Sequence, residues 1–464
     1  MNQTHLLSIF KKALEAVDPY KAVQSAFELT NGKITLGNTL THSYNKNTDG
    51  FNWLLRETGK IYLVGCGKAV CPMADAVEDV CDQYISSGIV VTKYGHRTPS
   101  RLSKIKVIEA AHPVPDNNGL IGANKVRDIL KNAGKDDLVI TLISGGGSAL
   151  WPLPVHGISL KDLVLTNEIL LESGASIHEI NSIRKHISEL QGGKAASLAY
   201  PSTVIAFIIS DVIGDDLDTI ASGPFYPDSS TFATASRVIR KYRLDKEMPR
   251  AVSSYITNGI KGIYDDTPKK NDPCFNNTYH LLVGSNKIAL KAAREHALKL
   301  GFDCILVEQP VQGESKDAAR NFCQQIKAIC STRENLKPLC IISGGETTVT
   351  LKKPYGKGGR NQEFALAAAV LIQGQMISIL SCGTDGSDGP TDATGAMVDG
   401  DFMRTCSEMG LNAENYLANH DSYSLFEKTG NLIKTGPTLT NVMDIQIALV
   451  GGDKERFFID KTRI

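Results

Sequence analysis

The chain has 464 residues, with 50 Lys and Arg against 50 Asp and Glu, and a formal net charge of +0. This length exceeds one ordinary hydrophobic core and predicts two domains. The balanced charge argues against nucleic acid as a partner, because proteins that bind phosphate backbones usually carry a basic excess. Hydrophobic residues make up 42% and charged residues 22%, which indicates a globular chain rather than a disordered one.

The cysteines and the first residues of the chain indicate a cytoplasmic protein. The ten cysteines contain no Cys-x-x-Cys pair, as expected of reduced, partly buried thiols. The opening stretch MNQTHLLSIFKKALEAVDPYKAVQSAF is amphipathic at helical spacing and lacks the continuous apolar region of a signal peptide. No run approaches the roughly 18 apolar residues of a spanning helix. We therefore expect no membrane partner, and the sequence leaves a homo-oligomer open.

Short apolar runs alternate with amphipathic stretches along the chain, which is typical of an α/β fold. Continuous rather than alternating apolar strands predict parallel, doubly wound sheets that are covered by helices on both faces. The predicted strands are 61–65, 88–92, 106–110, 138–144, 204–210, 280–284, 304–308, 340–343, 377–381 and 445–450. The predicted helices are 70–84, 119–133, 176–190, 285–300, 315–329 and 359–373.

The segment 261–278 is the strongest candidate for a boundary between domains. It is rich in Asp, Lys, Asn and Pro and has no hydrophobic periodicity, so it reads as a linker or surface loop. It divides the chain into an N-terminal domain at 1–265 and a C-terminal domain at 275–464.

The two halves of the chain resemble each other in where they carry glycine and acidic residues. Each half has one strand that opens into Ser-Gly-Gly and a later strand that opens into an acidic, glycine-containing loop. One interpretation is that two similarly built domains turn the carboxyl ends of their strands toward one cleft, where α/β proteins bind ligands. The alternative is that Gly and Asp simply shape the strand ends, as they do in many α/β proteins.

The segment IYLVGCGKAV combines a strand, a Gly-x-Gly-Lys turn and the start of a helix. A dinucleotide-binding fingerprint would need Gly or Ala in place of Val70 and an acidic residue in place of Lys93. A Walker A loop would need Gly at Tyr62 and Ser or Thr at Ala69. The turn therefore predicts an anion site at which backbone N–H groups and the ammonium group of Lys68 act together. The alternative is a solvent-exposed lysine after a tight turn.

Two glycine-rich segments follow predicted strands and are candidates for binding phosphate. Glycines let backbone N–H groups approach phosphate oxygens closely. The alternative is a flexible loop without a ligand. The candidate residues are Ser144, Gly145, Gly146, Gly147 and Ser148 in ISGGGSAL, and Gly344, Gly345 and Glu346 in ISGGETTV.

Acidic and basic residues near the predicted strand ends suggest further ligand contacts. Asp211 and Asp385 are the first acids after their strands, and Mg²⁺ prefers one or two carboxylates together with substrate phosphates. The alternative for these acidic loops is turn formation through Asp and Gly. Arg360 offers a planar fork for a carboxylate or phosphate, unless it is a surface arginine. Arg184 is a further basic candidate on the predicted helix 176–190.

Several of these motifs, in this order, resemble the type-2 glycerate kinases, also called the MOFRL family, which includes proteins named hydroxypyruvate reductase. The resemblance runs from about residue 5 to 451. The motifs that carry it are VGCGKA, HPVPDNNG, ISGGGSAL, INSIRKHISELQGGKAA, SDVIGDDLDTIASGPFYPD, ISGGETTVTL, GKGGRNQEFALA, CGTDGSDGPTDATGA and TGPTLTNVMDIQIALV.

The resemblance implies ATP-dependent phosphorylation of D-glycerate at its 2-hydroxyl, which gives 2-phosphoglycerate and ADP. It implies an N-terminal Rossmann-like, doubly wound α/β/α sandwich and a C-terminal α/β domain of MOFRL type, with the active site in the cleft between them. It also points to Lys68 and Arg360 as residues needed for activity.

For this chemistry, the residues divide into candidate roles. Lys68, Arg360, Asp211 and Asp385 are the catalytic candidates, and the two aspartates are the candidate Mg²⁺ ligands. Lys68, Arg360 and Arg184 are the candidates for binding the substrate, with ATP and glycerate as small-molecule partners. Two other functions remain open, namely an NAD(P)-dependent hydroxypyruvate reductase and a non-catalytic protein that binds a metabolite.

Overall fold

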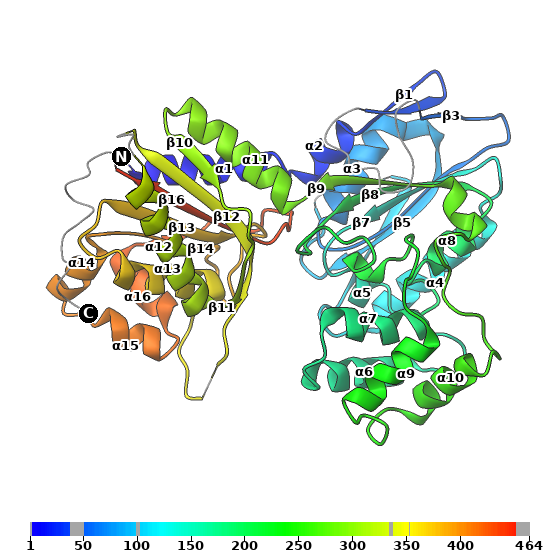
Figure 1. The fold of residues 1–464 in the computed structure, drawn as a ribbon. Coiled ribbons are helices and arrows are strands. Elements are labelled where there is room, and N and C mark those ends of the chain that lie inside the picture. The colour runs from blue at the N-terminus through cyan, green and yellow to red at the C-terminus, as the bar shows by residue number, and fades with distance from the viewer. Residues whose placement is uncertain (1, 38–50, 99–102, 334–336, 352, 452–464) are drawn as a thin grey trace. The chain divides into compact units, whose positions relative to one another are not determined.

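The computed structural model describes residues 2–37, 51–98, 103–333, 337–351 and 353–451 (Figure 1). These residues form two compact units. The N-terminal unit is Pro19–Val283, and the C-terminal unit combines Met1–Asp18 with Gly284–Ile464. The first helix of the chain therefore belongs to the C-terminal unit, whereas the sequence suggested an N-terminal domain at 1–265. The division falls at Gly284 and not within the segment 261–278.

The N-terminal unit is built on a six-stranded sheet with the order β6-β5-β4-β7-β8-β9. Its strands are β4 (Ile61–Cys66), β5 (Ile85–Lys93), β6 (Ile105–Ala110), β7 (Leu138–Ile143), β8 (Thr203–Ile209) and β9 (Thr278–Gly284). The pairs from β6 through to β8 are all parallel, as predicted. All six residues of β7 are buried, as expected of a central parallel strand that is covered on both faces.

The strand β9 and the segment before it belong to this same unit. We predicted 280–284 as the first strand of the second half, but β9 is the edge strand beside β8. The preceding segment packs onto the unit through Asp266, which contacts His186 Nε2 at 2.7 Å, and Thr267, whose hydroxyl donates to Asp228 at 2.8 Å. A polar, aperiodic sequence thus marks a packed surface loop here rather than a linker.

Helices cover the sheet of the N-terminal unit, and a further group of helices packs together around a core of its own. They are α2 (Pro19–Gln24), α3 (Val70–Cys81), α4 (Asn117–Asn132), α5 (Gly147–Leu150), α6 (Leu160–Glu172), α7 (Ile177–His186), α8 (Lys194–Ala199), α9 (Phe232–Lys241) and α10 (Arg250–Ile260). The helices α6, α7, α9 and α10 lie together (Figure 1) around a hydrophobic core that includes Ile183, Phe232 and Val252. Short antiparallel strands β1 (Phe27–Thr30), β2 (Lys33–Leu36) and β3 (Asn52–Leu54) complete the unit.

The C-terminal unit has a seven-stranded sheet with the order β10-β12-β16-β13-β14-β15, and β11 pairs with β12. The strands are β10 (Asp303–Leu306), β11 (Val311–Glu314), β12 (Leu339–Thr348), β13 (Ile377–Gly383), β14 (Gly395–Asp399), β15 (Leu432–Ile433) and β16 (Asp444–Val450). The strand β16 is antiparallel to both β12 and β13, so the prediction of a second parallel sheet was wrong. All seven residues of β16 are buried, and burial on both faces produces a continuous apolar run whichever way the strand points.

Helices of the C-terminal unit come from both ends of the chain. They are α1 (Asn2–Glu15), α11 (Asn286–Lys299), α12 (Ser315–Thr332), α13 (Arg360–Leu371), α14 (Phe402–Glu408), α15 (Ala413–Ala418) and α16 (Ser422–Thr429). The helix α1 packs against α11 (Figure 1), where Ser8 Oγ lies 2.7 Å from His296 Nε2. The alanine-rich α13 is buried from Asn361 to Ala369, so it forms the centre of this unit's core. None of the described helices is long and apolar enough to cross a membrane.

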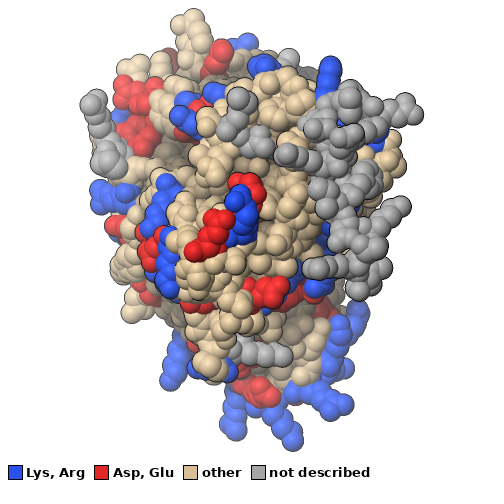
Figure 2. Space-filling view, turned by 90° about the vertical axis from the view of Figure 1, so that its left-hand side faces the viewer, with Lys and Arg blue, Asp and Glu red and all other residues tan. Residues whose placement is uncertain are grey.

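Charged side chains are mixed on the surface that Figure 2 shows. Basic and acidic groups alternate in small clusters over much of this face, with Lys and Arg more frequent toward its lower edge. This mixture agrees with the equal numbers of basic and acidic residues in the chain.

Candidate functional site

The turn that carries Lys68 is fixed by hydrogen bonds to the loop after the neighbouring strand β7. The Lys68 N–H donates to the Gly145 carbonyl at 3.0 Å, and the Ala69 N–H donates to Ser144 Oγ at 3.0 Å. Gly67 has a φ of +134°, and a Cβ there would lie 2.1 Å from Ser144 Oγ, so only glycine fits. The Ser144 hydroxyl, which we expected to bind phosphate, thus holds the Lys68 turn against β7.

The glycines after β7 allow three segments of the unit to approach one another closely. Gly146 has a φ of +87°, and a Cβ there would lie 3.0 Å from His112 Cδ2. A Cβ on Gly147 would lie 2.6 Å from Ala221 Cβ. The Ser148 hydroxyl contacts the Ser222 hydroxyl at 2.8 Å. The glycine-rich loop that we predicted to bind phosphate therefore lies at the carboxyl end of β7, beside the Lys68 turn, and its phosphate binding stays a prediction.

Asp211 lies two residues after Ile209, which ends the next strand of the sheet, β8, and it is half-buried. Burial raises the pKa of its carboxyl group, while the positive charge of Lys68 acts to lower that pKa. The structure thus places Asp211 within electrostatic reach of Lys68, as the strand order suggests. Other acids of the same loop have local roles, since Asp216 accepts from the Asp218 N–H at 3.1 Å and Asp218 forms an ion pair with Lys185.

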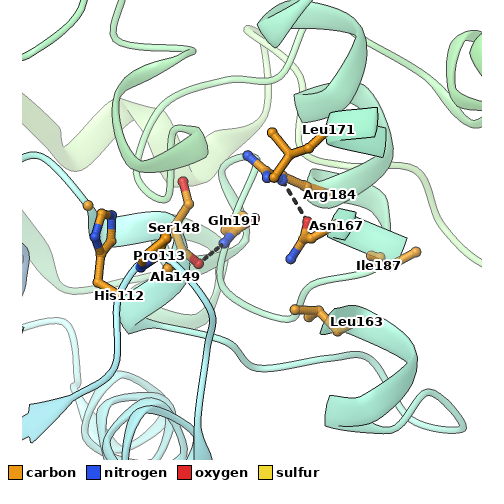
Figure 3. Close-up of a pocket in the computed structure, with 11 residues that line it drawn as sticks. His112, Pro113, Ser148, Ala149, Leu163, Asn167, Leu171, Arg184, Ile187 and Gln191 are labelled. Atoms are coloured by element: carbon orange, nitrogen blue, oxygen red, sulfur yellow. Dashed lines mark hydrogen bonds between the residues drawn. The ribbon is translucent and has the colours of Figure 1, made fainter. Parts of the chain in front are cut away.

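A pocket of about 260 Å³ lies in the N-terminal unit between the phosphate loop and the helices α6 and α7 (Figure 3). Gly146 and Ser148 line it on the loop side, and Arg184 of α7 lines it on the helix side. The Arg184 Nε donates to Asn167 Oδ1 of α6 at 2.7 Å (Figure 3). Gln191 also lines the pocket and donates from Nε2 to the Ser148 carbonyl at 3.1 Å. Three of the predicted site residues therefore share one cavity.

Two basic side chains of this pocket have unusual surroundings. Burial lowers the pKa of the Arg184 guanidinium, and no carboxylate of the described residues pairs with it. Burial, together with the charges of Lys68 and Lys93, lowers the pKa of His112 to about 4. His112 is therefore a neutral imidazole at neutral pH, whereas an arginine keeps its charge even when buried.

In the C-terminal unit, Arg360 is the first residue of α13 and is bound by two carboxylates. Its Nε and Nη2 donate to the two carboxylate oxygens of Asp444 at 2.6 and 2.9 Å, and its Nη1 lies 2.7 Å from Glu346 Oε1. Burial acts to lower the pKa of Arg360, but the hydrogen bonds and charge of Asp444 outweigh it and raise that pKa. The fork that we expected to be available for a ligand is thus already engaged by protein carboxylates.

The glycines that we predicted as a second phosphate loop lie inside a strand. Gly344 and Gly345 belong to β12, which continues to Thr348, and they pair with Ile445 and Asp444 of β16. A Cβ on Gly344 would lie 2.0 Å from Asn286 Oδ1. The prediction of a loop here was wrong, because close packing of neighbouring segments accounts for glycine at this strand position.

The acidic loop after β13 supplies one turn and one helix cap. Asp385 Oδ1 accepts from the N–H and the hydroxyl of Ser387 at 3.0 and 3.2 Å, which is the turn-forming role weighed above. Asp388 accepts from the backbone N–H groups of Asn361 and Gln362 at 3.0 and 2.9 Å and so caps α13. Burial raises the pKa of Asp388 to about 6.

A second pocket, of about 440 Å³, lies in the C-terminal unit next to these groups. Glu346, Arg360, Glu363 and His420 are among the residues that line it. The buried carboxylate of Glu363 contacts His420 Nδ1 at 2.8 Å and Lys316 Nζ at 3.5 Å. Charged side chains therefore line this pocket. Arg360 pairs with Glu346, and Lys316 pairs with Glu363.

Asp444 is the functional candidate that the sequence reasoning missed. It opens the wholly buried strand β16, and burial raises its pKa while Arg360 acts to lower it. The signal was present in the motif VMDIQIALV, because an aspartate at the head of a buried apolar strand requires a cationic partner. Its identity as Arg360, 84 residues away, could not be read from local pattern.

Comparisons with known proteins show the family to which this chain belongs. The model of a domain of unknown function, DUF4147, matches residues 5–257, and the MOFRL family model matches residues 339–444. A glycerate 2-kinase of Pyrococcus horikoshii is 42% identical over 451 residues, which cover 97% of this chain and 98% of that protein. A D-glycerate 2-kinase of Thermotoga maritima is 38% identical over 446 residues, which cover 96% and 97%.

A solved structure supports the same assignment. The crystal structure of a glycerate kinase from Thermotoga maritima superposes with a TM-score of 0.82 at 38% identity. The match covers 96% of this chain and 99% of that chain. Two relatives of this similarity, matched along nearly their whole length, together with the MOFRL match, establish that this chain belongs to the family of the glycerate 2-kinases.

Proposed function

We propose that this chain is a glycerate 2-kinase, which transfers a phosphoryl group from ATP to the 2-hydroxyl of D-glycerate and releases ADP. The observation that carries the proposal is the identity of 42% to a glycerate 2-kinase over 97% of the chain. The geometry of both units is compatible with it, since phosphoryl transfer depends on positioning and charge neutralisation rather than on covalent chemistry by the protein.

In the N-terminal unit, Lys68 is the proposed electrostatic catalyst. Its backbone is fixed against β7 by the hydrogen bond to Gly145, so its ammonium group extends from a rigid turn. Gly146 and Gly147 give phosphate oxygens close access to the backbone at the same strand ends. Asp211, near Lys68, provides a carboxylate in the same region.

In the C-terminal unit, Arg360 is the proposed second electrostatic group. Asp444 and Glu346 fix its guanidinium, so its orientation is set before any substrate binds. Fixed charges stabilise a transition state well because they need no reorganisation during the reaction. In this role Arg360 provides a fixed positive charge near the reacting groups, and it does not itself bind a substrate carboxylate through two hydrogen bonds.

Magnesium enters this reaction with ATP as part of the substrate. Among the described residues, no group of three or more His, Cys, Asp and Glu side chains could hold a metal ion. Mg²⁺ that bridges nucleotide phosphates needs only one or two protein carboxylates. Asp211 of the N-terminal unit and Asp385 of the C-terminal unit each suit that limited requirement, and we propose each as a candidate ligand of the nucleotide-bound ion.

The test is an ADP-release assay with purified protein, ATP, Mg²⁺ and a series of small hydroxy acids. We expect D-glycerate to give the highest kcat/KM of the series. A parallel assay with NADH and hydroxypyruvate addresses the reductase that the sequence left open, and we expect no loss of NADH absorbance. If ADP release does not depend on glycerate, the proposed function is wrong.

A further inference from the structure

We propose that the pocket of the N-terminal unit is the acceptor subsite, in which Arg184 binds the carboxylate of a small hydroxy acid. The proposal rests on the kinase function above and names the part of the chain that selects its acceptor. It assigns the carboxylate contact to Arg184 rather than to Arg360.

The partners of Arg184 carry the proposal. Only its Nε has a hydrogen-bond partner among the described residues, the Asn167 Oδ1 at 2.7 Å. Both terminal nitrogens of the guanidinium remain for a ligand on the pocket side, and a carboxylate matches that planar pair bidentately. Arg184 is half-buried, and a cation withdrawn from water without a counter-ion is unfavourable, so an anionic ligand would reduce that penalty.

The guanidinium of Arg360, unlike that of Arg184, is already paired with protein carboxylates. Its three nitrogens contact Asp444 and Glu346, so two negative charges already surround it. A substrate carboxylate would have to displace Glu346 to reach its Nη1. Of these two arginines, Arg184 is therefore the one whose surroundings call for an added carboxylate.

The size and walls of the pocket indicate a small acceptor. Its volume of about 260 Å³ lies below the range of roughly 300–1,000 Å³ that is usual for drug-sized ligands. Leu163, Leu171 and Ile187 line it near Arg184 and provide an apolar wall (Figure 3). These features suit a short carboxylic acid with few carbons better than a nucleotide.

The end of the pocket opposite Arg184 carries groups that can orient the hydroxyl groups of the bound acid toward the glycine-rich loop after β7. His112 lies on the opposite side from Arg184, with Ser148 between them (Figure 3). Because His112 is neutral, one of its ring nitrogens accepts a hydrogen bond, which a substrate hydroxyl can donate. An acid anchored at Arg184 would thus present its hydroxyl groups to the strand ends that carry Gly146 and Lys68.

The experiment measures how Arg184 affects acceptor binding in the full chain. D-Glycerate is titrated calorimetrically into wild type, Arg184→Gln and Arg184→Lys, with and without a non-hydrolysable ATP analogue. We expect Arg184→Gln to weaken glycerate binding by about ten- to a hundredfold, as for the loss of charged hydrogen bonds. The glycerate affinity of Arg184→Lys should lie between those of wild type and Arg184→Gln, because lysine keeps the positive charge but lacks the planar pair of terminal nitrogens. The exposed Arg240→Gln is the matched control and should bind as wild type does.

Steady-state kinetics separates a binding role from general damage. The KM for glycerate should rise in Arg184→Gln while the KM for ATP stays within a factor of two. Glycolate, which keeps the carboxylate but lacks the third carbon, should inhibit competitively, and its inhibition constant should rise by the same factor. If the variant unfolds, Asn167→Ala provides the second test, because it releases the Nε contact and should raise the glycerate KM alone.

The outcomes distinguish this proposal from the proposed function. If wild type phosphorylates glycerate but neither Arg184 nor Asn167 variants change its binding, the subsite is wrong and the kinase assignment stands. If glycerate binding depends on Arg184 but no ADP forms, the kinase assignment fails and the subsite stands. Absence of glycerate binding to wild type under both nucleotide conditions overturns the subsite.

Discussion

The half-buried guanidinium of Arg360 and the fully buried carboxylate of Asp444 form a two-bond ion pair, with distances of 2.6 and 2.9 Å. It joins the first residue of α13 to the first residue of β16. Because Asp444 is fully buried, its charge depends on this partner. The pair therefore serves both the stability of the C-terminal unit and the orientation of the proposed catalytic guanidinium.

We predict that Arg360→Lys is not a conservative change. Lysine keeps the charge but cannot reproduce two parallel hydrogen bonds to Asp444. We expect kcat to fall by at least about tenfold and the free energy of unfolding to fall by about 1–3 kcal/mol. Denaturant unfolding and steady-state kinetics measure the two effects. If kcat and the glycerate KM both stay within a factor of two, Arg360 is a bystander in the reaction.

Asp444→Asn tests the same pair from the other side. It leaves the Arg360 guanidinium, whose side chain is 33% exposed, with Glu346 as its remaining carboxylate. The loss in unfolding free energy should therefore lie below the about 3–5 kcal/mol that breaking a fully buried pair typically costs. The double variant with Arg360→Met should lose less than the sum of the two single variants, because both remove the same interaction. Additive losses in unfolding free energy would contradict the coupling.

We predict that Lys68→Met abolishes most turnover and leaves the fold intact. The lysine side chain is only half-buried, but its backbone is fixed by Gly145. Loss of one transition-state charge contact should lower kcat by roughly 10²–10³. The exposed Lys106→Met is the control. A folded Lys68 variant with more than a third of normal activity would remove the proposed role.

The pH dependence of stability should report on Asp388. Its folded-state pKa of about 6 lies above its ordinary value of 3.8, since burial raises it more than the α13 N–H groups lower it. The folded protein then binds a proton more tightly than the unfolded chain does. Stability therefore falls as pH rises from about 4 to 6, by at most about 3 kcal/mol, and is level above that range.

Asp388→Asn should remove this slope, since an amide does not titrate. Unfolding free energies measured from pH 4 to 7 provide the comparison, with Asp401→Asn as an exposed control of the same unit. The variant also loses one acceptor for the α13 N–H groups, so its stability should be lower at pH 7. An unchanged slope between pH 4 and 6 would show that Asp388 titrates normally.

The grouping of the candidate residues within the N-terminal unit was largely predictable from sequence. In a parallel sheet the carboxyl ends of neighbouring strands share one edge, so Lys68 after β4, Gly145 after β7 and Asp211 after β8 had to lie near one another. The glycines carried a second signal, because Gly67 and Gly146 adopt positive φ values where the chain turns. Local pattern and topology pointed to the same region.

The contacts of the candidate residues in the C-terminal unit were less predictable, because they join segments that lie far apart in the sequence. The reversed direction of β16 and the Arg360–Asp444 pair depend on which strand lies beside which, and hydrophobic periodicity does not encode that. The leucine and phenylalanine spacing of α1 predicted a buried face but not its partner. The structure shows that partner to be α11, where Ser8 meets His296.

We predict that the two acidic strand ends affect the Mg²⁺ requirement. Asp211→Asn and Asp385→Asn should each raise several-fold the Mg²⁺ concentration needed for half-maximal rate, because each removes a hard, charged oxygen. Asp216→Asn is the matched control, since Asp216 bonds to Asp218 and Thr219 within its own loop. Unchanged Mg²⁺ titrations in both test variants would leave Asp211 and Asp385 as turn-forming residues.

The last prediction concerns which hydroxyl of glycerate receives the phosphoryl group. D-Glycerate has a secondary hydroxyl at C2, next to the carboxylate, and a primary hydroxyl at C3. An acid held by its carboxylate at Arg184 presents its hydroxyls at different distances from the Lys68 turn, and a shift of about 1 Å is costly in a positioned reaction. One anchor should therefore give one product, and membership of the glycerate 2-kinase family makes that product 2-phosphoglycerate.

Direct coupling to enolase measures this choice. Enolase acts on 2-phosphoglycerate and not on 3-phosphoglycerate, so phosphoenolpyruvate should form without added phosphoglycerate mutase. Arg184→Lys places the anchoring charge on a shorter, more flexible side chain, so it should lower the rate before it changes the product. If phosphoenolpyruvate forms only after mutase is added, the enzyme phosphorylates C3. The carboxylate would then lie farther from the phosphate loop than an acceptor at C2 requires.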